Sequence, residues 1–406
     1  MITATIITIG DELLIGQTID TNSTWIAQEF NKIGIAIKRR IAISDQREEI
    51  LKTLSEATAL SEIVITTGGL GPTNDDITKD CLCAFFDSDL VCHKPSLEHI
   101  TQFFASRNRE LLSVNIEQAN VPDKCTVLMN TVGTAPGMHF KKDKTHYFSM
   151  PGVPFEMKLL VEKQIIPILQ KEYKLGGMIH QTIVTSGKGE SFLANELVDF
   201  EKQLPHGISM AYLPNFLTVK IRLSGEAKMQ YKINTEIKTL KAKLGDLIIS
   251  ETDQTLEEIL FSILKDKKLT LSIAESCTGG SIASKLVSLS GSSEVFMGSV
   301  VTYSVLSKQN ILGVKKESIE EHGVVSKEVA IEMSTQVKEK FTSTVGIATT
   351  GFLEGAEQYF YASVAINENV ITKRFSLPYG RKLNSNLATS LSFQLAIQSL
   401  IKKSSL

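Results

Sequence analysis

Short apolar runs alternate with amphipathic stretches along the first 70 residues. Residues 2–9 form a run of β-branched and apolar side chains, and strands are also predicted at 35–43 and 63–67. The stretches between them, 23–33 and 47–60, carry apolar residues at helical spacing. Because strands buried on both faces are typical of parallel sheets, this alternation predicts βαβ units.

The rest of the chain continues the pattern with interruptions. Helices are predicted at 96–118 and 155–170, and a smaller α+β module without a catalytic cluster follows. From residue 256 onward helices and strands alternate again. We therefore expect three α/β or α+β domains, which span residues 1–170, 171–250 and 251–406.

Composition narrows the class of protein. Among 406 residues, 42% are apolar and 22% are charged, as in an ordinary globular chain. The net charge of −2 gives no electrostatic reason to expect a nucleic acid partner. Five irregularly spaced cysteines favour a reducing compartment over a disulfide framework. The absence of a signal peptide pattern and of a long apolar span predicts a cytoplasmic protein without a membrane partner.

The loop at residues 66–80 is the first candidate for chemistry. Three glycines and a proline lie between Gly68 and Pro72, directly after a predicted strand and before a helix. A glycine-rich loop between a strand and a helix is a common way to present backbone N–H groups to a phosphate. A structural turn is the alternative, since such loops are frequent.

Acidic residues follow the ends of the predicted strands. Asp11 follows the first strand, Asp45 the second, and the loop at 68–76 the third. Because ligands of parallel sheets bind beyond the carboxyl ends of the strands, these residues are expected to share one crevice. A divalent cation that bridges a pyrophosphate, with an aspartate orienting water, would make this site a pyrophosphohydrolase. The carboxylates available as hard oxygen ligands are Asp45, Asp75, Asp76 and Asp80.

A second candidate site lies in the last domain. The sequence Glu-Ser-Cys-Thr-Gly-Gly at 275–280 follows a predicted strand and begins a helix. This position favours a nucleophile and supplies N–H donors for an oxyanion. No histidine lies nearby, and Lys308, five residues after Tyr303, is the candidate base for a Ser–Lys hydrolase. The alternative is a helix start capped by serine or threonine in a binding module without chemistry.

These motifs together resemble the CinA family over nearly the whole chain. The resemblance implies an N-terminal molybdopterin-binding-like three-layer α/β domain, a small α+β middle domain and a C-terminal α/β amidase-like domain. It also implies a homodimer. The segments that carry it are residues 9–22, 66–80, 133–137, 151–157, 275–280 and 301–304 with Lys308, and 322–326.

Two activities follow from the resemblance. The N-terminal domain would be an ADP-ribose pyrophosphatase that uses Mg²⁺, Mn²⁺ or Co²⁺, with Asp45 and Asp76 as catalytic and metal-binding residues. The C-terminal domain would deamidate nicotinamide mononucleotide without a cofactor, through Ser276, Tyr303 and Lys308. The implied substrate-binding residues of the N-terminal domain are Gly10, Asp11, Gly68, Gly69, Gly71, Pro72, Thr73, Gly133 and Thr134. Those of the C-terminal domain are Thr278, Gly279, Gly280 and Arg381.

One segment departs from the family pattern. After Thr350 and Gly351 the family continues with a Gly-Pro-Gly-Gly loop that helps to form the nucleotide pocket. Here residues 352–358 read Phe-Leu-Glu-Gly-Ala-Glu-Gln, whose acidic side chains would repel a phosphate. This segment leaves open a nucleotide-sensing scaffold with an inactive C-terminal site. The first-domain pattern leaves open a second alternative, a molybdopterin- or pterin-binding protein.

Overall fold

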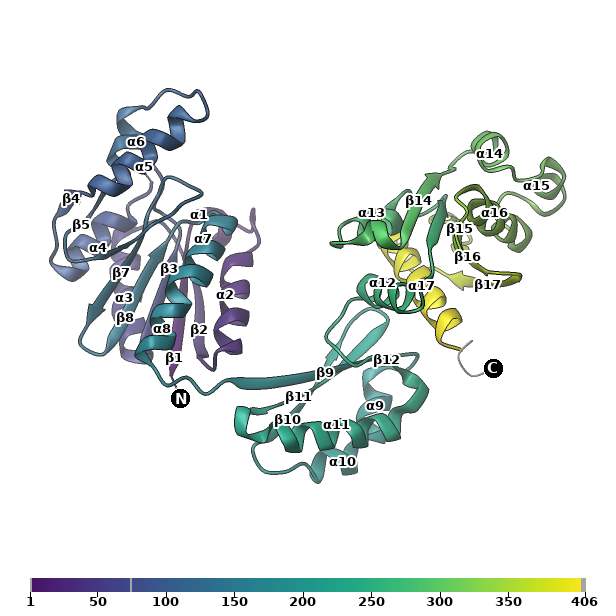
Figure 1. Cartoon of the computed structure of the whole chain (residues 1–406), viewed down its shortest axis with the longest axis horizontal. Coiled ribbons are helices and arrows are strands. Elements are labelled where there is room, and N and C mark those ends of the chain that lie inside the picture. Colours follow the sequence, from purple (N-terminus) through teal and green to yellow (C-terminus); the bar gives the residue numbers. More distant parts are fainter. Residues whose placement is uncertain (1, 74, 403–406) are drawn as a thin grey trace. The chain divides into compact units, whose positions relative to one another are not determined.

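The computed structural model describes residues 2–73 and 75–402 (Figure 1). The chain forms two compact units, which are described separately. The first comprises Met1–Ile179 with Gly225–Gln230, and the second His180–Ser224 with Tyr231–Leu406. The boundaries of the three predicted domains remain a prediction. None of the helices in the described part of the chain is long and apolar enough to cross a membrane.

A mixed sheet forms the centre of the first unit. Its strands are β1 (Thr3–Ile9), β2 (Ala36–Ile43), β3 (Ile63–Thr67), β6 (Thr126–Leu128), β7 (Gly137–Lys142) and β8 (Thr145–Met150). They lie in the order β2-β1-β3-β8-β7-β6. Strands β2, β1, β3 and β8 run parallel to one another, as the apolar runs predict. Strand β7 is antiparallel to β8, and β6 is antiparallel to β7.

Helices cover both faces of this sheet and make three layers (Figure 1). Alternate residues of β1 point to opposite faces, so Ile6 packs with α2 (Thr21–Lys32), α7 (Pro154–Leu160) and α8 (Ile166–Glu172). Ile7 packs on the other face with α3 (Arg47–Leu60) and α4 (Thr78–Phe86). Burial on both faces explains why β1 is apolar throughout. The remaining elements of this unit are α1 (Asp11–Leu14), β4 (Leu90–Cys92), α5 (Lys94–Ala105), α6 (Ser113–Glu117) and β5 (Asn120–Pro122).

Two predicted helices are interrupted. The helix predicted at 96–118 is wrong as a single element, because Asn108 adopts a left-handed conformation with φ 51° between α5 and α6. The helix predicted at 155–170 contains a π-helical turn at Val161–Ile165. Pro167 follows this turn and has no N–H group to donate, which is a common cause of such an irregularity.

The second unit contains two sheets. The smaller one has the order β10-β11-β9-β12, and the larger one has the order β14-β13-β15-β16-β17. Strands β13, β14 and β15 are parallel, whereas β16 and β17 are antiparallel to their neighbours. The strands are β9 (Met178–Ser186), β10 (Ile208–Pro214), β11 (Thr218–Glu226), β12 (Ile248–Ser250), β13 (Leu271–Glu275), β14 (Phe296–Val301), β15 (Val345–Phe352), β16 (Tyr359–Ile366) and β17 (Asn369–Ser376).

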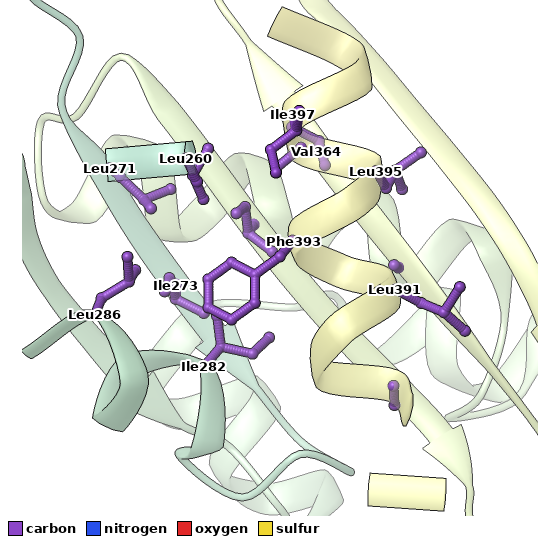
Figure 2. Packing of buried hydrophobic residues seen from close by; sticks show 14 of the residues in the cluster. Leu260, Leu271, Ile273, Ile282, Leu286, Val364, Leu391, Phe393, Leu395 and Ile397 are labelled. Carbon is purple, nitrogen blue, oxygen red and sulfur yellow. The ribbon is translucent and has the colours of Figure 1, made fainter. Parts of the chain in front are cut away.

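Helices also cover both faces of the larger sheet. Figure 2 shows Phe393 of the last helix beside Ile273 of β13 and Ile282, in the core of one face. Met333 and Val337 pack on the other face. The helices are α9 (Glu190–Glu196), α10 (Val198–Lys202), α11 (Gln230–Leu244), α12 (Leu256–Asp266), α13 (Ser281–Val287), α14 (Val305–Ser307), α15 (Lys316–His322), α16 (Lys327–Lys340) and α17 (Arg381–Lys402).

Gly68 is required where β3 ends beside β1. Its φ is +115°, and a Cβ atom there would lie 2.1 Å from the carbonyl oxygen of Ile9. We expect Gly68→Ala to lower the free energy of unfolding by about 2 kcal/mol or more, because both backbone strain and overlap oppose the methyl group. Urea unfolding measures this, with Gly16→Ala as the control, since Gly16 has φ +74° and open space around it. Equal losses in both variants would contradict the prediction.

Candidate active sites

A cavity of about 380 Å³ lies at the carboxyl ends of the parallel strands of the first unit. Its lining includes Ile9 at the end of β1, Asp45 after β2, Gly68 after β3 and Pro151 after β8. The crevice therefore lies where the strand order predicts it. The predicted site residues in this lining are Gly10, Asp45, Gly68, Gly69, Gly71, Pro72, Asp76 and Thr134.

Three other predicted residues, Asp11, Thr73 and Gly133, are outside this lining but contact residues that belong to it. The backbone N–H of Asp11 donates to Asp45 Oδ2 at 3.2 Å. The backbone N–H of Thr73 donates to Asp76 Oδ2 at 3.0 Å, and its hydroxyl donates to the same oxygen. Gly133 lies against the carboxylate of Glu156, which a Cβ atom at this position would overlap. The Asp76 turn also explains why α4 begins only at Thr78.

The loop after β3 carries backbone donors that could bind a phosphate. The N–H groups of Gly69, Leu70 and Gly71 donate to no acceptor within residues 2–73 and 75–402. Gly69 has φ +65°, and a Cβ there would lie 2.1 Å from Thr78 Oγ1, so the loop packs closely on the start of α4. Unpaired N–H groups beside a cavity are typical of an anion site.

The same cavity concentrates negative charge. Asp45, Glu12, Asp75 and Asp76 all line it. Burial raises the pKa of Asp45, and the neighbouring carboxylates of Asp11, Glu12 and Asp75 raise it further. No group of three or more His, Cys, Asp or Glu side chains in the described residues is arranged to hold a metal ion. The donors nevertheless fit a hard cation such as Mg²⁺, which uses one or two carboxylates together with substrate phosphates and water.

Glu156 is a residue of this cavity to which the sequence assigned no role. It lies in the first turn of α7 and is 9% exposed. Asn130 Nδ2 donates to its Oε2 at 2.6 Å, while Asn130 Oδ1 accepts from the N–H groups of Val132 and Gly133. Burial raises the pKa of Glu156. This carboxyl therefore holds the loop at 130–135, whose Thr134 and Ala135 line the same cavity as the loop after β3.

The raised pKa of Glu156 predicts a pH-dependent change in stability. Because the folded pKa lies above the unfolded value, the folded state binds an extra proton, and stability falls as pH rises through this range. We expect Glu156→Gln, which keeps the acceptor for Asn130, to melt above wild type at pH 7. The difference should shrink as pH falls toward the ordinary glutamate value of about 4.5, and it should stay small below that pH. Thermal unfolding measures this, with exposed Glu98→Gln as the control; a lower melting temperature at pH 7 would contradict it.

A second cavity, of about 350 Å³, lies in the second unit beside the end of β13. Four predicted residues line it, namely Ser276, Tyr303, Lys308 and Arg381. Thr278, Gly279 and Gly280 are outside its lining and form the turn into α13.

Ser276 and Lys308 are in direct contact at this cavity. Lys308 Nζ donates to Ser276 Oγ at 2.8 Å, to the carbonyl oxygen of Thr302 at 2.7 Å and to that of Tyr303 at 3.4 Å. Lys308 is 1% exposed, and burial lowers its pKa to about 8. An amine with this pKa exchanges a proton near neutral pH, so it can act as the base for the serine.

The structure distinguishes Ser276 from its two neighbours as nucleophile. Burial raises the pKa of the Cys277 thiol to about 12, which keeps it protonated. Thr278 is 2% exposed, and its hydroxyl lies 2.8 Å from that of Thr349. Only Ser276 of the three contacts a candidate base among the described residues.

Glu275, rather than a serine or threonine, caps the helix that follows. Its carboxylate accepts from the N–H groups of Gly280, Ile282 and Ala283 at 3.0, 3.1 and 2.9 Å. The interpretation of residues 275–280 as a helix start capped by serine or threonine is therefore wrong. The N–H groups of Cys277 and Thr278 donate to no oxygen in the described chain, and Cys277 lines the cavity together with Ser276.

Tyr303 and Arg381 form the mouth of the cavity. Tyr303 is 61% exposed, and its hydroxyl accepts from Arg381 Nη2 at 2.7 Å. Arg381 Nη1 donates to Glu354 Oε1 at 2.6 Å. The structure thus places the hydroxyl of Tyr303 against Arg381, while the carbonyl group of the same residue contacts Lys308.

Two sequence families match the two ends of the chain. Residues 5–171 match a family described as a probable molybdopterin binding domain, and residues 253–400 match the CinA C-terminal domain. A crystal structure of the protein CinA, of unknown function, from Thermoplasma acidophilum is 30% identical. It covers 42% of this chain and 96% of its own, with a TM-score of 0.37.

Relatives of similar length match most of the chain. A CinA-like protein from Flavobacterium psychrophilum is 48% identical over 86% of this chain and 85% of its own length. A CinA-like protein from Cytophaga hutchinsonii is 38% identical over 98% of this chain and 97% of its own. The chain therefore belongs to the CinA family, and it combines a molybdopterin-binding-like α/β domain with a CinA C-terminal domain.

Proposed function

We propose that the C-terminal cavity is a Ser–Lys amidase site that deamidates a pyridine nucleotide such as nicotinamide mononucleotide. The observation that carries this proposal is the 2.8 Å contact between Lys308 Nζ and Ser276 Oγ, made by a buried lysine with a pKa of about 8. The nicotinamide substrate is suggested by the family to which the chain belongs.

The reaction would proceed through an acyl-enzyme. Ser276 Oγ attacks the carboxamide carbon while Lys308 accepts the hydroxyl proton. The N–H groups of Cys277 and Thr278 bind the oxyanion of the tetrahedral intermediate. The C–N bond then breaks, Lys308 returns the proton to the leaving nitrogen, and ammonia departs. Water hydrolyses the ester to free Ser276 and release the nicotinate product.

Ammonia release tests this proposal. The purified chain should release ammonia from nicotinamide mononucleotide, and Ser276→Ala should abolish the release. Unchanged release in the variant would exclude Ser276 as nucleophile. The contact between Ser276 and Lys308 favours this activity over a nucleotide-sensing scaffold with an inactive site.

For the N-terminal cavity we propose a metal-dependent pyrophosphatase that acts on ADP-ribose. Asp45 and Asp76 would hold a divalent cation, which when bound neutralises the charge of the pyrophosphate. The N–H groups of Gly69, Leu70 and Gly71 bind phosphate oxygens, and the carboxylate of Asp45 orients water. Water adds to one phosphorus and the bridging P–O bond breaks, which gives AMP and ribose 5-phosphate.

A pterin is the second candidate ligand of this cavity. It is favoured by the match of residues 5–171 to a probable molybdopterin binding domain. AMP release from ADP-ribose with Mg²⁺, Mn²⁺ or Co²⁺ supports the pyrophosphatase. A copurified pterin, seen by fluorescence after oxidation, in a protein that releases no AMP would favour the pterin instead.

A further inference from the structure

A buried glutamine of the N-terminal cavity has a side-chain oxygen without a hydrogen-bond donor. Gln118 follows α6, is 4% exposed and lines the cavity that contains Asp45 and Asp76. Its Oε1 is buried and accepts from no donor within residues 2–73 and 75–402. A buried acceptor that lacks a donor costs free energy, so a group that enters the cavity is expected to supply one.

The backbone at Gln118 is fixed to the helix that follows the Asp76 turn. Lys79 is the second residue of α4 and lies three residues after Asp76. Its Nζ donates to the carbonyl oxygen of Gln118 at 3.2 Å and to that of Asn120 at 3.0 Å. Gln118 is therefore anchored to the part of the fold that also carries the proposed metal ligand Asp76.

The donor that Gln118 Oε1 lacks cannot come from a phosphate group. Phosphate oxygens and the lining carboxylates accept hydrogen bonds, and they offer none to another acceptor. The unpaired N–H groups of the loop after β3 are donors, but the proposed pyrophosphatase uses them to bind phosphate oxygens. The attacking water is a donor that the reaction itself requires.

A water molecule needs two acceptors to be held in one orientation. With a single acceptor it rotates about that hydrogen bond, whereas two acceptors hold both hydrogens and direct a lone pair at the phosphorus. The carboxylate of Asp45 is one acceptor in the proposed reaction, and Gln118 adds a second without bringing further negative charge to the pyrophosphate. The last torsion angle of a glutamine side chain is broad, so Oε1 turns toward the water at little cost.

We propose that Gln118 orients the attacking water by accepting a hydrogen bond from it through Oε1. The proposal rests on the pyrophosphatase function proposed above and adds a water-positioning residue to that site. The water oxygen forms the new bond to phosphorus, the bridging P–O bond breaks with its electron pair on the leaving phosphate, and one water proton passes to solvent. The amide of Gln118 neither gains nor loses a proton.

Two variants, Gln118→Met and Gln118→Glu, separate orientation of the water from binding of the substrate. AMP release from ADP-ribose with Mg²⁺ is measured on the full chain. Methionine has a similar length but no comparable acceptor, so kcat should fall on the order of 10²-fold while KM stays nearly unchanged. Glutamate keeps an acceptor oxygen, so kcat should stay close to wild type, while its charge raises KM. Gln102→Met is the matched control, because Gln102 is an exposed residue of α5 outside the cavity lining.

Thermal unfolding of the same proteins without ligand gives a second readout. Gln118→Met should melt above wild type, because the substitution removes a buried acceptor that has no donor. Gln102→Met should melt with wild type. A Gln118→Met protein that melts below wild type would show that the amide stabilises the fold, and this result would overturn the proposal.

The kinetic outcomes distinguish this proposal from the function on which it rests. Gln118→Met with the kcat of wild type would overturn the role of Gln118, and so would equal losses of kcat in Gln118→Met and Gln118→Glu. A higher KM without a loss of kcat in Gln118→Met would assign the amide to substrate binding, for instance to a ribose hydroxyl, and would also overturn it. In these cases wild type still releases AMP. A wild type that releases no AMP contradicts the pyrophosphatase function, and the role of Gln118 fails with it.

Discussion

Replacing Lys308 by methionine should lower kcat for ammonia release by on the order of 10²- to 10⁴-fold, the contribution of a positioned general base. Methionine fills a similar volume among the buried side chains but cannot accept the proton of Ser276. Lys316→Met is the matched control, since Lys316 is an exposed lysine of α15 in the same domain. Steady-state ammonia release measures both variants.

The pH profile of the wild-type chain checks the same role independently. Burial lowers the pKa of Lys308 to about 8, so the free amine becomes the major form only above that pH. Ammonia release should therefore rise through about pH 8 and level off above it. A rate that falls over this range, or Lys308→Met with wild-type kcat, would show that Lys308 is not the base.

Asp76→Asn should lower AMP release from ADP-ribose by on the order of 10²- to 10³-fold, since several kcal/mol of charge stabilisation depend on the metal site. Asparagine keeps an oxygen that can accept from the N–H and hydroxyl of Thr73, so the turn before α4 should persist. Product analysis at saturating Mg²⁺ measures the loss.

The control for this variant is Asp80→Asn. Asp80 lies in the first turn of α4, is exposed and is outside the cavity lining, although the sequence alone made it a candidate ligand. The Asp80→Asn variant should release AMP at the wild-type rate. Equal losses in Asp76→Asn and Asp80→Asn would point to a general effect of charge and not to a ligand at Asp76.

Local periodicity was enough to predict the elements that are buried on defined faces. The helix at 47–60 and the strand at 63–67 have the predicted bounds. Buried residues recur along this helix from Ile50 to Ala57, and all residues of the strand are buried. The helix predicted at 96–118 failed where packing gives little guidance, since residues 106–110 are exposed. There the left-handed Asn108 separates α5 from α6.

Pairings across long sequence distances could not be read from local pattern. Strand order explains why Asp45 and the loop after β3 share a cavity, so that site was predictable in outline. The Ser276–Lys308 contact spans 32 residues. The lack of a nearby histidine had made Lys308 the candidate base, and the family resemblance indicated the same pair. Glu156 with Asn130 and Glu354 with Arg381 are 26 and 27 residues apart, and no periodicity links them.

The helix cap at α13 shows a further limit. Serine and threonine are common caps, so residues 276–278 fitted that role in sequence. In the structure, the carboxylate of Glu275 caps the helix, and the Ser276 hydroxyl contacts Lys308 instead. The sequence of residues 276–278 fits both a capping role and a catalytic role, and only the hydrogen-bond partners in the structure distinguish the two.

If the chain holds two independent hydrolytic sites, one comparison of variants shows it. AMP release from ADP-ribose and ammonia release from nicotinamide mononucleotide are measured on the full chain and on the variants Asp76→Asn and Ser276→Ala. We expect Asp76→Asn to lose AMP release and keep ammonia release, and Ser276→Ala to do the reverse. A single variant that abolishes both activities while the protein stays folded, or a wild type that shows neither, would contradict it.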